Sequence, residues 1–317
     1  MRILTTALLS LCFFSSFAWA DKAPPLQASY VARQVADGVF VVHGPKGVPS
    51  PQNQGFMNNP GFILTDAGVV VIDPGGSVQV GDMLLQQIRK RSQQPVVAVF
   101  DTHVHGDHWL ANQAIAEAYP EAKIYAHPKM MARVAQGAGE TWLEVMNNLT
   151  KGATRGTKVA PPGSPVDDGL VMEIGGVEFH VLHQGLSHTD NDIMIYLPQK
   201  KVIFLGDNAG NGRMLRLNDG DVLGNIANLN RALNSGARVF VPGHGPTGGK
   251  EAAVQYRDYL QTLYDGVKRY YAEDLSDFEI KPLLLPQLAR WKHWTDFEDL
   301  VGSHISVTYL QVEAAEF

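Results

Sequence analysis

Short apolar runs separated by turn-forming residues organise the start of the chain. Residues 30–35, 39–43, 62–65 and 69–73 are such runs, with Asp-Gly, Gly-Pro and Asp-Ala-Gly between them. Runs of this length bounded by Gly, Pro and Asp predict strands joined by turns. We therefore expect a β-meander. It is interrupted at residues 44–60 by a Gly-, Pro- and Asn-rich segment that is long for a hairpin and suggests a functional loop.

Farther along, helical and extended patterns alternate. Apolar residues that recur every three to four positions predict helices, and short continuous apolar runs predict buried strands. The expected helices are residues 80–91, 110–119, 128–149 and 224–233, and the expected strands are residues 95–100, 123–126, 170–174, 177–182, 192–197, 202–205 and 239–242. Residues 151–168, which contain Pro161-Pro162-Gly163, are predicted to be a surface insertion. Two strand-rich halves of this kind predict an α/β fold with two sheets face to face and helices outside both.

The two ends of the chain differ from this middle part. Arg2 precedes an apolar run that ends in Ala18-Trp19-Ala20, which predicts a signal peptide at residues 1–20, cleaved after Ala20, and a periplasmic or secreted protein. Residues 251–317 have a mostly helical pattern that begins with a long Tyr-rich segment. We expect one domain at residues 21–250 and a helical extension at residues 251–317 packed on it.

Composition narrows the chemistry. The formal net charge is −6, and an acidic surface argues against nucleic acid as the main partner. No segment after the signal approaches the ~20 apolar residues of a membrane span, so we expect no membrane insertion. The only cysteine, Cys12, lies in the predicted signal. Any transition metal in the exported chain must therefore be held by His, Asp or Glu.

Four potential metal ligands lie within six residues after the strand at residues 95–100, in Asp101-Thr102-His103-Val104-His105-Gly106-Asp107-His108. On an extended, sharply turning loop, alternate residues project to one side, so His103 and His105 would share a face. Gly106 would turn the chain so that the next two side chains face a second point. Clustered His and Asp are typical ligands of zinc and similar metals, whereas the alternative is a set of solvated loop histidines.

This segment resembles the H-x-H-x-D-H signature of the metallo-β-lactamase superfamily. Four more motifs resemble that family in the same order, at Asp73 in Val70-Val71-Ile72-Asp73-Pro74-Gly75, His188 in Gly185-Leu186-Ser187-His188-Thr189-Asp190, Asp207 in Phe204-Leu205-Gly206-Asp207 and His244 in Val241-Pro242-Gly243-His244-Gly245. The resemblance covers roughly residues 39–246. It implies a four-layer αββα sandwich in which all five motifs meet at one edge.

The resemblance also implies a ligand set and a reaction. A first zinc would be bound by His103, His105 and His188, a second by Asp107, His108 and His244, and Asp207 would bridge the two. Asp73 would accept hydrogen bonds that fix the ligand loop. The implied cofactor is two Zn²⁺ per chain, with Fe or Mn as alternatives. The implied reaction is attack by a metal-bridging hydroxide on the acyl carbonyl of a small-molecule ester, thioester, lactone or lactam, with Asp107 orienting the water and accepting its proton.

Residues for substrate contact are suggested only by position. Asn208 and Arg213 follow Asp207 on a Gly-rich loop, and Phe56, Met57 and Asn58 lie on the long early loop. The remaining candidates are expected to be structural or surface residues: His127, His180, His183, His293, His304, Trp142, Tyr256, Tyr259 and Tyr264.

Several alternatives remain open. A true β-lactamase is one, although the lack of cysteine and the presence of Asp207 make the site look more like those of glyoxalase-II-type thioesterases and lactonases. A persulfide dioxygenase-like oxidoreductase with one iron is another, and a non-catalytic accessory module is a third. The export signal and the Ser50-Pro51-Gln52-Asn53-Gln54-Gly55 segment also look like periplasmic metallohydrolases associated with quinoprotein or sulfur-oxidation systems.

Overall fold

The computed structural model describes residues 22–26 and 28–316, and the predicted signal peptide lies outside them. Two β-sheets form the centre of this part of the chain. One sheet has the strand order β1 (Arg33–Ala36), β2 (Val39–Val41), β3 (Gly61–Thr65), β4 (Gly68–Ile72), β5 (Val96–Phe100), β6 (Lys123–Ala126), β7 (Ser164–Pro165). The other has the order β12 (Val239–Val241), β11 (Val202–Phe204), β10 (Met194–Leu197), β9 (Val177–Leu182), β8 (Val171–Ile174).

The continuous apolar runs arise because each central strand is buried on both faces. In β4, Val70 and Ile72 pack in the core between the two sheets, whereas Val69 and Val71 pack in a second core outside the sheet. Successive strand side chains point to opposite faces, so both sets must be apolar. The strands of the second sheet follow the same rule, as in β11, where Phe204 faces the first sheet and Ile203 faces away.

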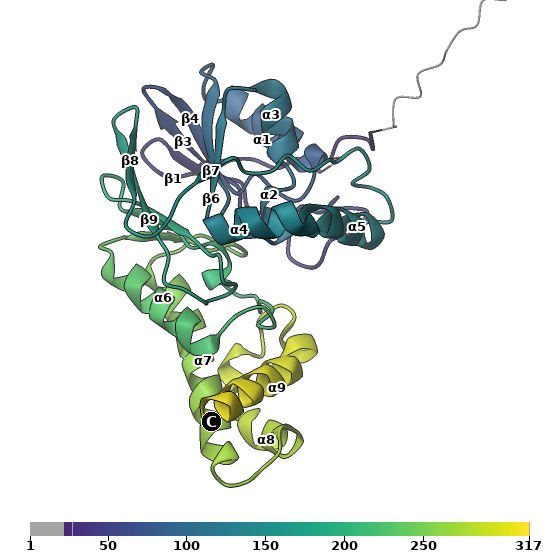
Figure 1. Ribbon diagram of the computed structural model, residues 1–317, viewed down its shortest axis with the longest axis vertical. Coiled ribbons are helices and arrows are strands. Elements are labelled where there is room, and N and C mark those ends of the chain that lie inside the picture. Colours follow the sequence, from purple (N-terminus) through teal and green to yellow (C-terminus); the bar gives the residue numbers. More distant parts are fainter. Residues whose placement is uncertain (1–21, 27, 317) are drawn as a thin grey trace, which may run out of the picture.

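Helices cover the outer faces and complete a four-layer αββα sandwich (Figure 1). Helices α1 (Val78–Arg89) and α3 (Asn112–Ala118) cover the first sheet, and α6 (Val222–Asn234) and α7 (Lys250–Tyr271) cover the second. Ser77 and Asp221 begin α1 and α6 as N-caps, since each side chain accepts a hydrogen bond from a free backbone amide. Helices α2 (Gly106–Trp109), α4 (Pro128–Arg133) and α5 (Gly139–Leu149) lie along one edge of the sandwich.

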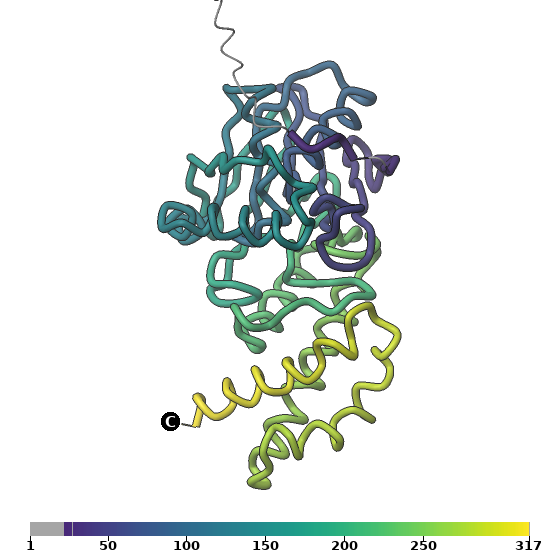
Figure 2. Tube along the Cα trace, turned by 90° about the vertical axis from the view of Figure 1, so that its right-hand side faces the viewer, coloured from purple at the N-terminus to yellow at the C-terminus, as the bar shows by residue number. Residues whose placement is uncertain are grey.

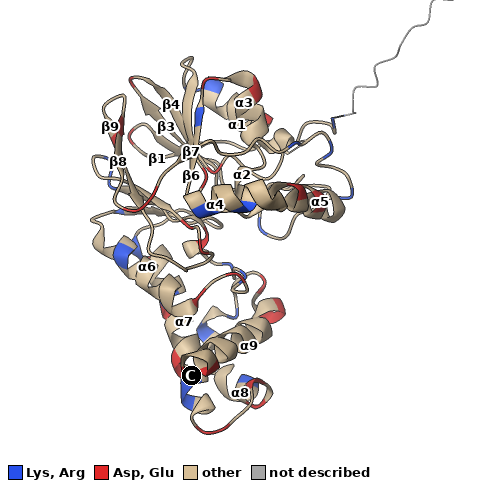
Figure 3. Ribbon diagram, viewed as in Figure 1, with Lys and Arg blue, Asp and Glu red and all other residues tan. Residues whose placement is uncertain are grey.

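The C-terminal helices form a lobe beyond the second sheet (Figure 2). Helix α7 leaves the sandwich, and α8 (Asp277–Leu284) and α9 (Phe297–Ala315) pack against it. Stacked aromatic rings, including Tyr256 and Trp294, lie in the core that the lobe shares with α6. Side chains of both charge signs are interspersed along these helices (Figure 3). In the described part of the chain, no helix has both the length and the apolar character needed to cross a membrane.

Two predicted elements differ from the structure. The single helix expected at residues 128–149 is interrupted by a π-helical turn at Val134–Ala138, where Gly137 has a φ of 99°. Glycine adopts this left-handed conformation without a steric penalty, so the helix breaks there. The insertion expected at residues 151–168 contributes the edge strand β7, which pairs with β6, and Val166 is buried between the sheets. The domain boundary at residue 250 stays a prediction.

Candidate metal centre

The five sequence motifs meet at one edge of the sandwich. Strand β4 pairs in parallel with β5, and β11 pairs in parallel with β12, so the carboxyl ends of each pair lie at the same edge. Asp73 follows β4, His103 follows β5, Asp207 follows β11 and His244 follows β12. His188 reaches the same place from the loop between β9 and β10.

One ligand group consists of His103, His105, His188 and Asp207. The His188 Nε2 atom lies 3.0 Å from His105 Nδ1 and 3.6 Å from Asp207 Oδ2, and His103 Nε2 lies 4.0 Å from the same oxygen. Four ligands at zinc–ligand distances of about 2.0–2.1 Å form a tetrahedron with edges of roughly 3.3 Å. The observed spacings are close to that size, and we call these four residues the first group.

A second group lies directly beside it and contains Asp107, His108 and His244. The His244 Nε2 atom is 3.2 Å from Asp107 Oδ2, and His108 Nε2 is 3.5 Å from the same oxygen. Asp207 Oδ1 lies 3.2 Å from His108 Nε2 and 3.3 Å from His244 Nε2. Because Asp207 turns Oδ2 to the first group and Oδ1 to this one, its carboxylate spans both.

Buried atoms without partners indicate what these groups are built to hold. His103 Nε2, His108 Nε2 and Asp207 Oδ1 are buried and have no hydrogen-bond partner. Leaving such atoms unpaired is costly, and one divalent cation in each group would satisfy them: His103 Nε2 in the first group, His108 Nε2 and Asp207 Oδ1 in the second. Gly243 has no room for a side chain, because a Cβ atom there would collide with Asp207 Oδ1. Both groups therefore fit divalent metal ions that accept nitrogen and oxygen ligands.

Hydrogen bonds behind the ligands fix which ring atom faces the centre. Asp73 accepts hydrogen bonds at 2.7 Å from the Thr102 amide and hydroxyl and at 2.8 Å from His108 Nδ1. Asp73 has a φ of 49°, a left-handed conformation that Asp tolerates better than most residues. His244 Nδ1 donates to the Met57 carbonyl at 2.8 Å. His105 Nε2 donates to Asp219 at 3.1 Å, which leaves Nδ1 for the centre.

The two groups differ in protonation. Burial and the neighbouring histidines lower the pKa of His103 well below its ordinary value and that of His188 to about 3. Burial also acts on His108 and His244, but the carboxylates around them outweigh it and raise the pKa of both rings. Conversely, these histidines hold the pKa of Asp107 below its ordinary value despite burial.

The structure places three of the five residues suggested for substrate contact in fully buried positions. Phe56 is fully buried against Tyr30, and Asn58 is fully buried with its amide donating to the Asp73 carbonyl. Asn208 is fully buried too and bonds to Ser187 and Leu205. These side chains hold the loops that carry the motifs and offer no surface to a substrate.

Met57 acts here through its carbonyl, so the early loop is a support in this structure. Arg213 is 8% exposed and ion-paired with Asp296. Gly106 was expected to turn the chain, yet it begins helix α2 without a positive φ. A side chain there would instead meet Trp142 at 2.8 Å.

Three residues beside the centre were missed by the sequence reasoning. Thr102 bonds to both Asp73 and His103, Asp219 bonds to His105, and Asp296 pairs with Arg213. Thr102 lies inside the motif and could have been suspected. Nothing in the sequence around Asp219 or Asp296 signals a role, because each approaches its partner only through the fold.

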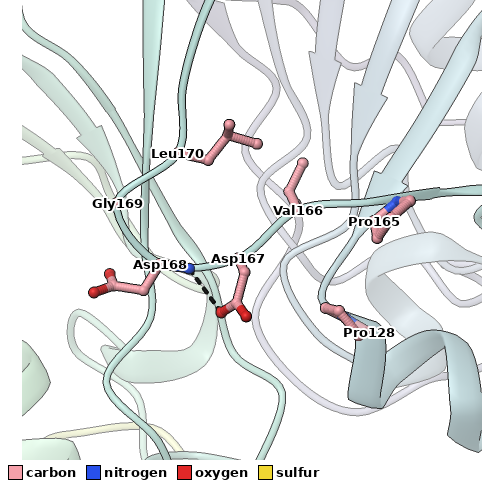
Figure 4. Close-up of a pocket in the computed structure, with 7 residues that line it drawn as sticks. All are labelled: Pro128, Pro165, Val166, Asp167, Asp168, Gly169 and Leu170. Atoms are coloured by element: carbon pink, nitrogen blue, oxygen red, sulfur yellow. Dashed lines mark hydrogen bonds between the residues drawn. The ribbon is translucent and has the colours of Figure 1, made fainter.

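Three histidines outside the motifs, His127, His183 and His304, have ring or hydrogen-bond partners away from the centre. The His127 ring stacks on His183 with centroids 4.0 Å apart and accepts a hydrogen bond from the Lys129 amide at a helix start. Tyr259 donates to His304 at 2.8 Å inside the C-terminal lobe. A shallow hollow of about 420 Å³ lies beside β7, and the side chains around it belong to none of the five motifs (Figure 4).

Comparison with known proteins identifies the scaffold. The chain is 27% identical over 271 residues to a linear primary-alkylsulfatase of Pseudomonas sp., covering 72% of this chain and 50% of the relative. It is 28% identical over 160 residues to a hydroxyacylglutathione hydrolase of Francisella tularensis subsp. novicida, covering 49% of this chain and 50% of that one. The chain thus spans about half the length of these curated relatives.

A solved structure and a family model agree with this picture. The structure of a stereoselective inverting sec-alkylsulfatase from Pseudomonas sp. matches with a TM-score of 0.69 at 18% identity, covering 89% of this chain and 50% of that chain, which shows a shared fold. The His/Asp cluster has the residue types and spacing that can hold divalent metal ions. Residues 53–244 match the model of the metallo-beta-lactamase superfamily, and the chain therefore belongs to that superfamily.

Proposed function

We propose that the protein is an exported hydrolase that holds two zinc ions and cleaves the acyl bond of a small ester, thioester, lactone or lactam. The observation that carries the proposal is the position of Asp207, which offers one carboxylate oxygen to each of two adjacent ligand groups. A shared carboxylate brings two ions close together, which is the arrangement that two-metal hydrolases use. The supporting comparison is the likeness to a hydroxyacylglutathione hydrolase.

Such ions, when bound, lower the pKa of a shared water to about 7 and offset negative charge on the reacting oxygens. The chain's own residues prepare the site for this. His103 and His188 are neutral at neutral pH and can ligate without losing a proton. Asp107 is kept ionised and buried, and it is the carboxylate that we assign to orient the water and accept its proton.

Access to the centre is proposed on the side of His105. This is the one half-buried member of the first group, whereas its three companions are buried. The indole of Trp142 lies 5.2 Å from the His105 ring and gives this side an apolar wall. Asp219, whose side chain is 58% exposed, forms the polar part of the same rim. We therefore propose a substrate that presents its scissile group between Trp142 and Asp219.

A second candidate is hydrolysis of an alkyl sulfate. It is favoured by the 27% identity to an alkylsulfatase over 72% of this chain, a longer match than that to the hydroxyacylglutathione hydrolase. The same two-ion centre could serve a sulfate ester, since it stabilises charge on the attacking and leaving oxygens alike. The acyl and sulfate candidates differ in substrate and share the site.

The test combines metal analysis with a substrate panel. We expect natively purified protein to contain two zinc ions per chain and to turn over a thioester, lactone or ester faster than a chromogenic cephalosporin or an alkyl sulfate. His105→Ala should abolish turnover and lower metal content while the fold persists by circular dichroism. His293→Ala, an exposed histidine on the C-terminal lobe, is the control.

Other outcomes would overturn parts of the proposal. A single iron per chain would favour the oxidoreductase alternative. Faster cleavage of the cephalosporin or the alkyl sulfate would reassign the substrate. Metal binding without turnover of any of these compounds would favour an accessory protein. Full activity in the His105→Ala variant would refute the site itself.

A further inference from the structure

We propose that Asp296, in the C-terminal lobe, is a positioning residue for the metal centre: it neutralises Arg213 beside His244 and so keeps the second group able to hold a cation. The proposal rests on the two-ion centre proposed above. It concerns residues 209–221, which connect Asp207 and its short 3-10 turn to α6 and which we call the anchored loop.

The anchored loop contacts ligands of both groups. The Asn211 amide donates to the His244 carbonyl at 3.0 Å, and the Arg213 guanidinium lies 3.4 Å from His244 Nδ1. Farther along the loop, Asp219 accepts the hydrogen bond from His105. A displacement of this loop would therefore reach a ligand of each ion.

The same loop is fastened to the C-terminal lobe. Thr295 exchanges two backbone hydrogen bonds with the loop, donating to the Gly212 carbonyl and accepting from the Met214 amide, each at 3.0 Å. Arg213 Nε donates to Asp296 at 3.1 Å. Gln311 of α9 donates to the Gly220 carbonyl at 2.9 Å and accepts from the Val222 amide just beyond the loop at 3.0 Å. The lobe thus holds the loop at both of its ends.

Among the contacts between the lobe and the anchored loop, the Asp296 contact is the one that neutralises a charge beside the metal centre. His244 Nδ1 donates its proton to the Met57 carbonyl, so this atom cannot accept a hydrogen bond from Arg213. The guanidinium is 8% exposed and would stand as a nearly buried positive charge next to a ligand of a positive ion. Such a charge is costly unless it is paired, and in this structure Asp296 pairs with it.

The backbone at Asp296 allows its charge to be tested by itself. Asp296 begins α9 with a φ of 66°, a left-handed conformation. Asn tolerates this conformation as well as Asp does, so Asp296→Asn removes the charge with little backbone strain. Asp299, exposed on the same helix, provides a matched control, since Asp299→Asn makes an equal change of charge away from the loop.

The experiment titrates metal-free protein with Zn²⁺ against a chromophoric chelator and with Co²⁺ followed by absorption. We expect wild type to bind two ions, and we expect Asp299→Asn to bind each of them with the same affinity as wild type. We expect Asp296→Asn to bind the second ion at least tenfold more weakly, with the first ion unchanged. The double variant Asp296→Asn with Arg213→Gln should regain the wild-type affinity for the second ion, because the unpaired positive charge of Arg213 is gone. Thermal unfolding of the metal-free proteins should differ little between Asp296→Asn and Asp299→Asn.

Distinct results would overturn the two proposals. Wild type that binds fewer than two ions would refute the two-ion centre. If wild type binds two ions, either of two results would refute only the role of Asp296. These are unchanged affinities in Asp296→Asn and no recovery of the second ion in the double variant. If Asp296→Asn does not fold, Arg213→Gln decides: it should keep the second ion, and loss of that ion would refute the proposal.

Discussion

The two ligand groups sit side by side and share Asp207, yet they are built differently. The first group is histidine-rich, and the pKa values of His103 and His188 are lowered, so these rings are neutral at neutral pH. In the second group the carboxylate of Asp207, joined by that of Asp107, raises the pKa of both His108 and His244. The first group can therefore bind a cation without releasing protons from His103 or His188, whereas the second must release protons from His108 and His244 to bind one.

Removing the shared ligand should have the largest effect. Asp207→Ala takes an oxygen from both groups, so we expect both ions to be lost. Loss of about 4 kcal/mol of transition-state stabilisation corresponds to roughly a thousandfold slower turnover. Metal content and kcat measure the result. Retention of one tightly bound ion would mean that the two groups are more independent than their geometry indicates.

The next largest effect should be a difference between the two groups in how their metal affinity depends on pH. Both His108 and His244 have a raised pKa, so they are protonated at pH 6 and must lose two protons when the second ion binds. Its affinity should then rise by up to about a hundredfold per pH unit from pH 6 upward. His103 and His188 are neutral there and lose no proton when they ligate, so affinity for the first ion should change much less. Isothermal titration in buffers of different ionisation enthalpy would count the protons released, and equal slopes would contradict the comparison.

Weakening a supporting residue should affect most the group whose ligand it contacts directly. Asp73 orients His108, and Asp73→Asn removes the negative charge while tolerating the left-handed backbone. We expect the second ion to bind about 10–100-fold more weakly, and the first ion to be affected less because Asp73 reaches its ligand His103 only through Thr102. Asp66→Asn, an exposed residue between β3 and β4, is the control for zinc titrations.

The smallest effect is expected on the first group at Asp219. Its side chain is 58% exposed, so water can replace much of its hydrogen bond to His105. Asp219→Asn should weaken the binding of the first ion by less than about tenfold and leave the affinity for the second ion unchanged. A larger loss, measured in the same zinc titration, would mean that Asp219 itself approaches the ion.

The motifs could be predicted because they are local. His103 and His105 are two positions apart after a strand, and the chain direction at the ends of parallel strands brings Asp73 and His103 to the same edge. The burial of Phe56 and Asn58 could not be predicted in this way. Loop residues with polar neighbours are ordinarily exposed, and only the contacts of residues 53–59 with α1 and the motif loops bury them.

The sequence by itself determined the layers, the motif order and the type of ligand atoms, because strand periodicity and ligand chemistry are written in neighbouring residues. The tertiary structure alone decided which nitrogen of each histidine faces the centre and which residues support it. His105 and its partner Asp219 are 114 residues apart, and Arg213 and Asp296 are 83 apart. Pairings over such distances depend on how loops and the C-terminal lobe pack, and no local pattern in the chain specifies that packing.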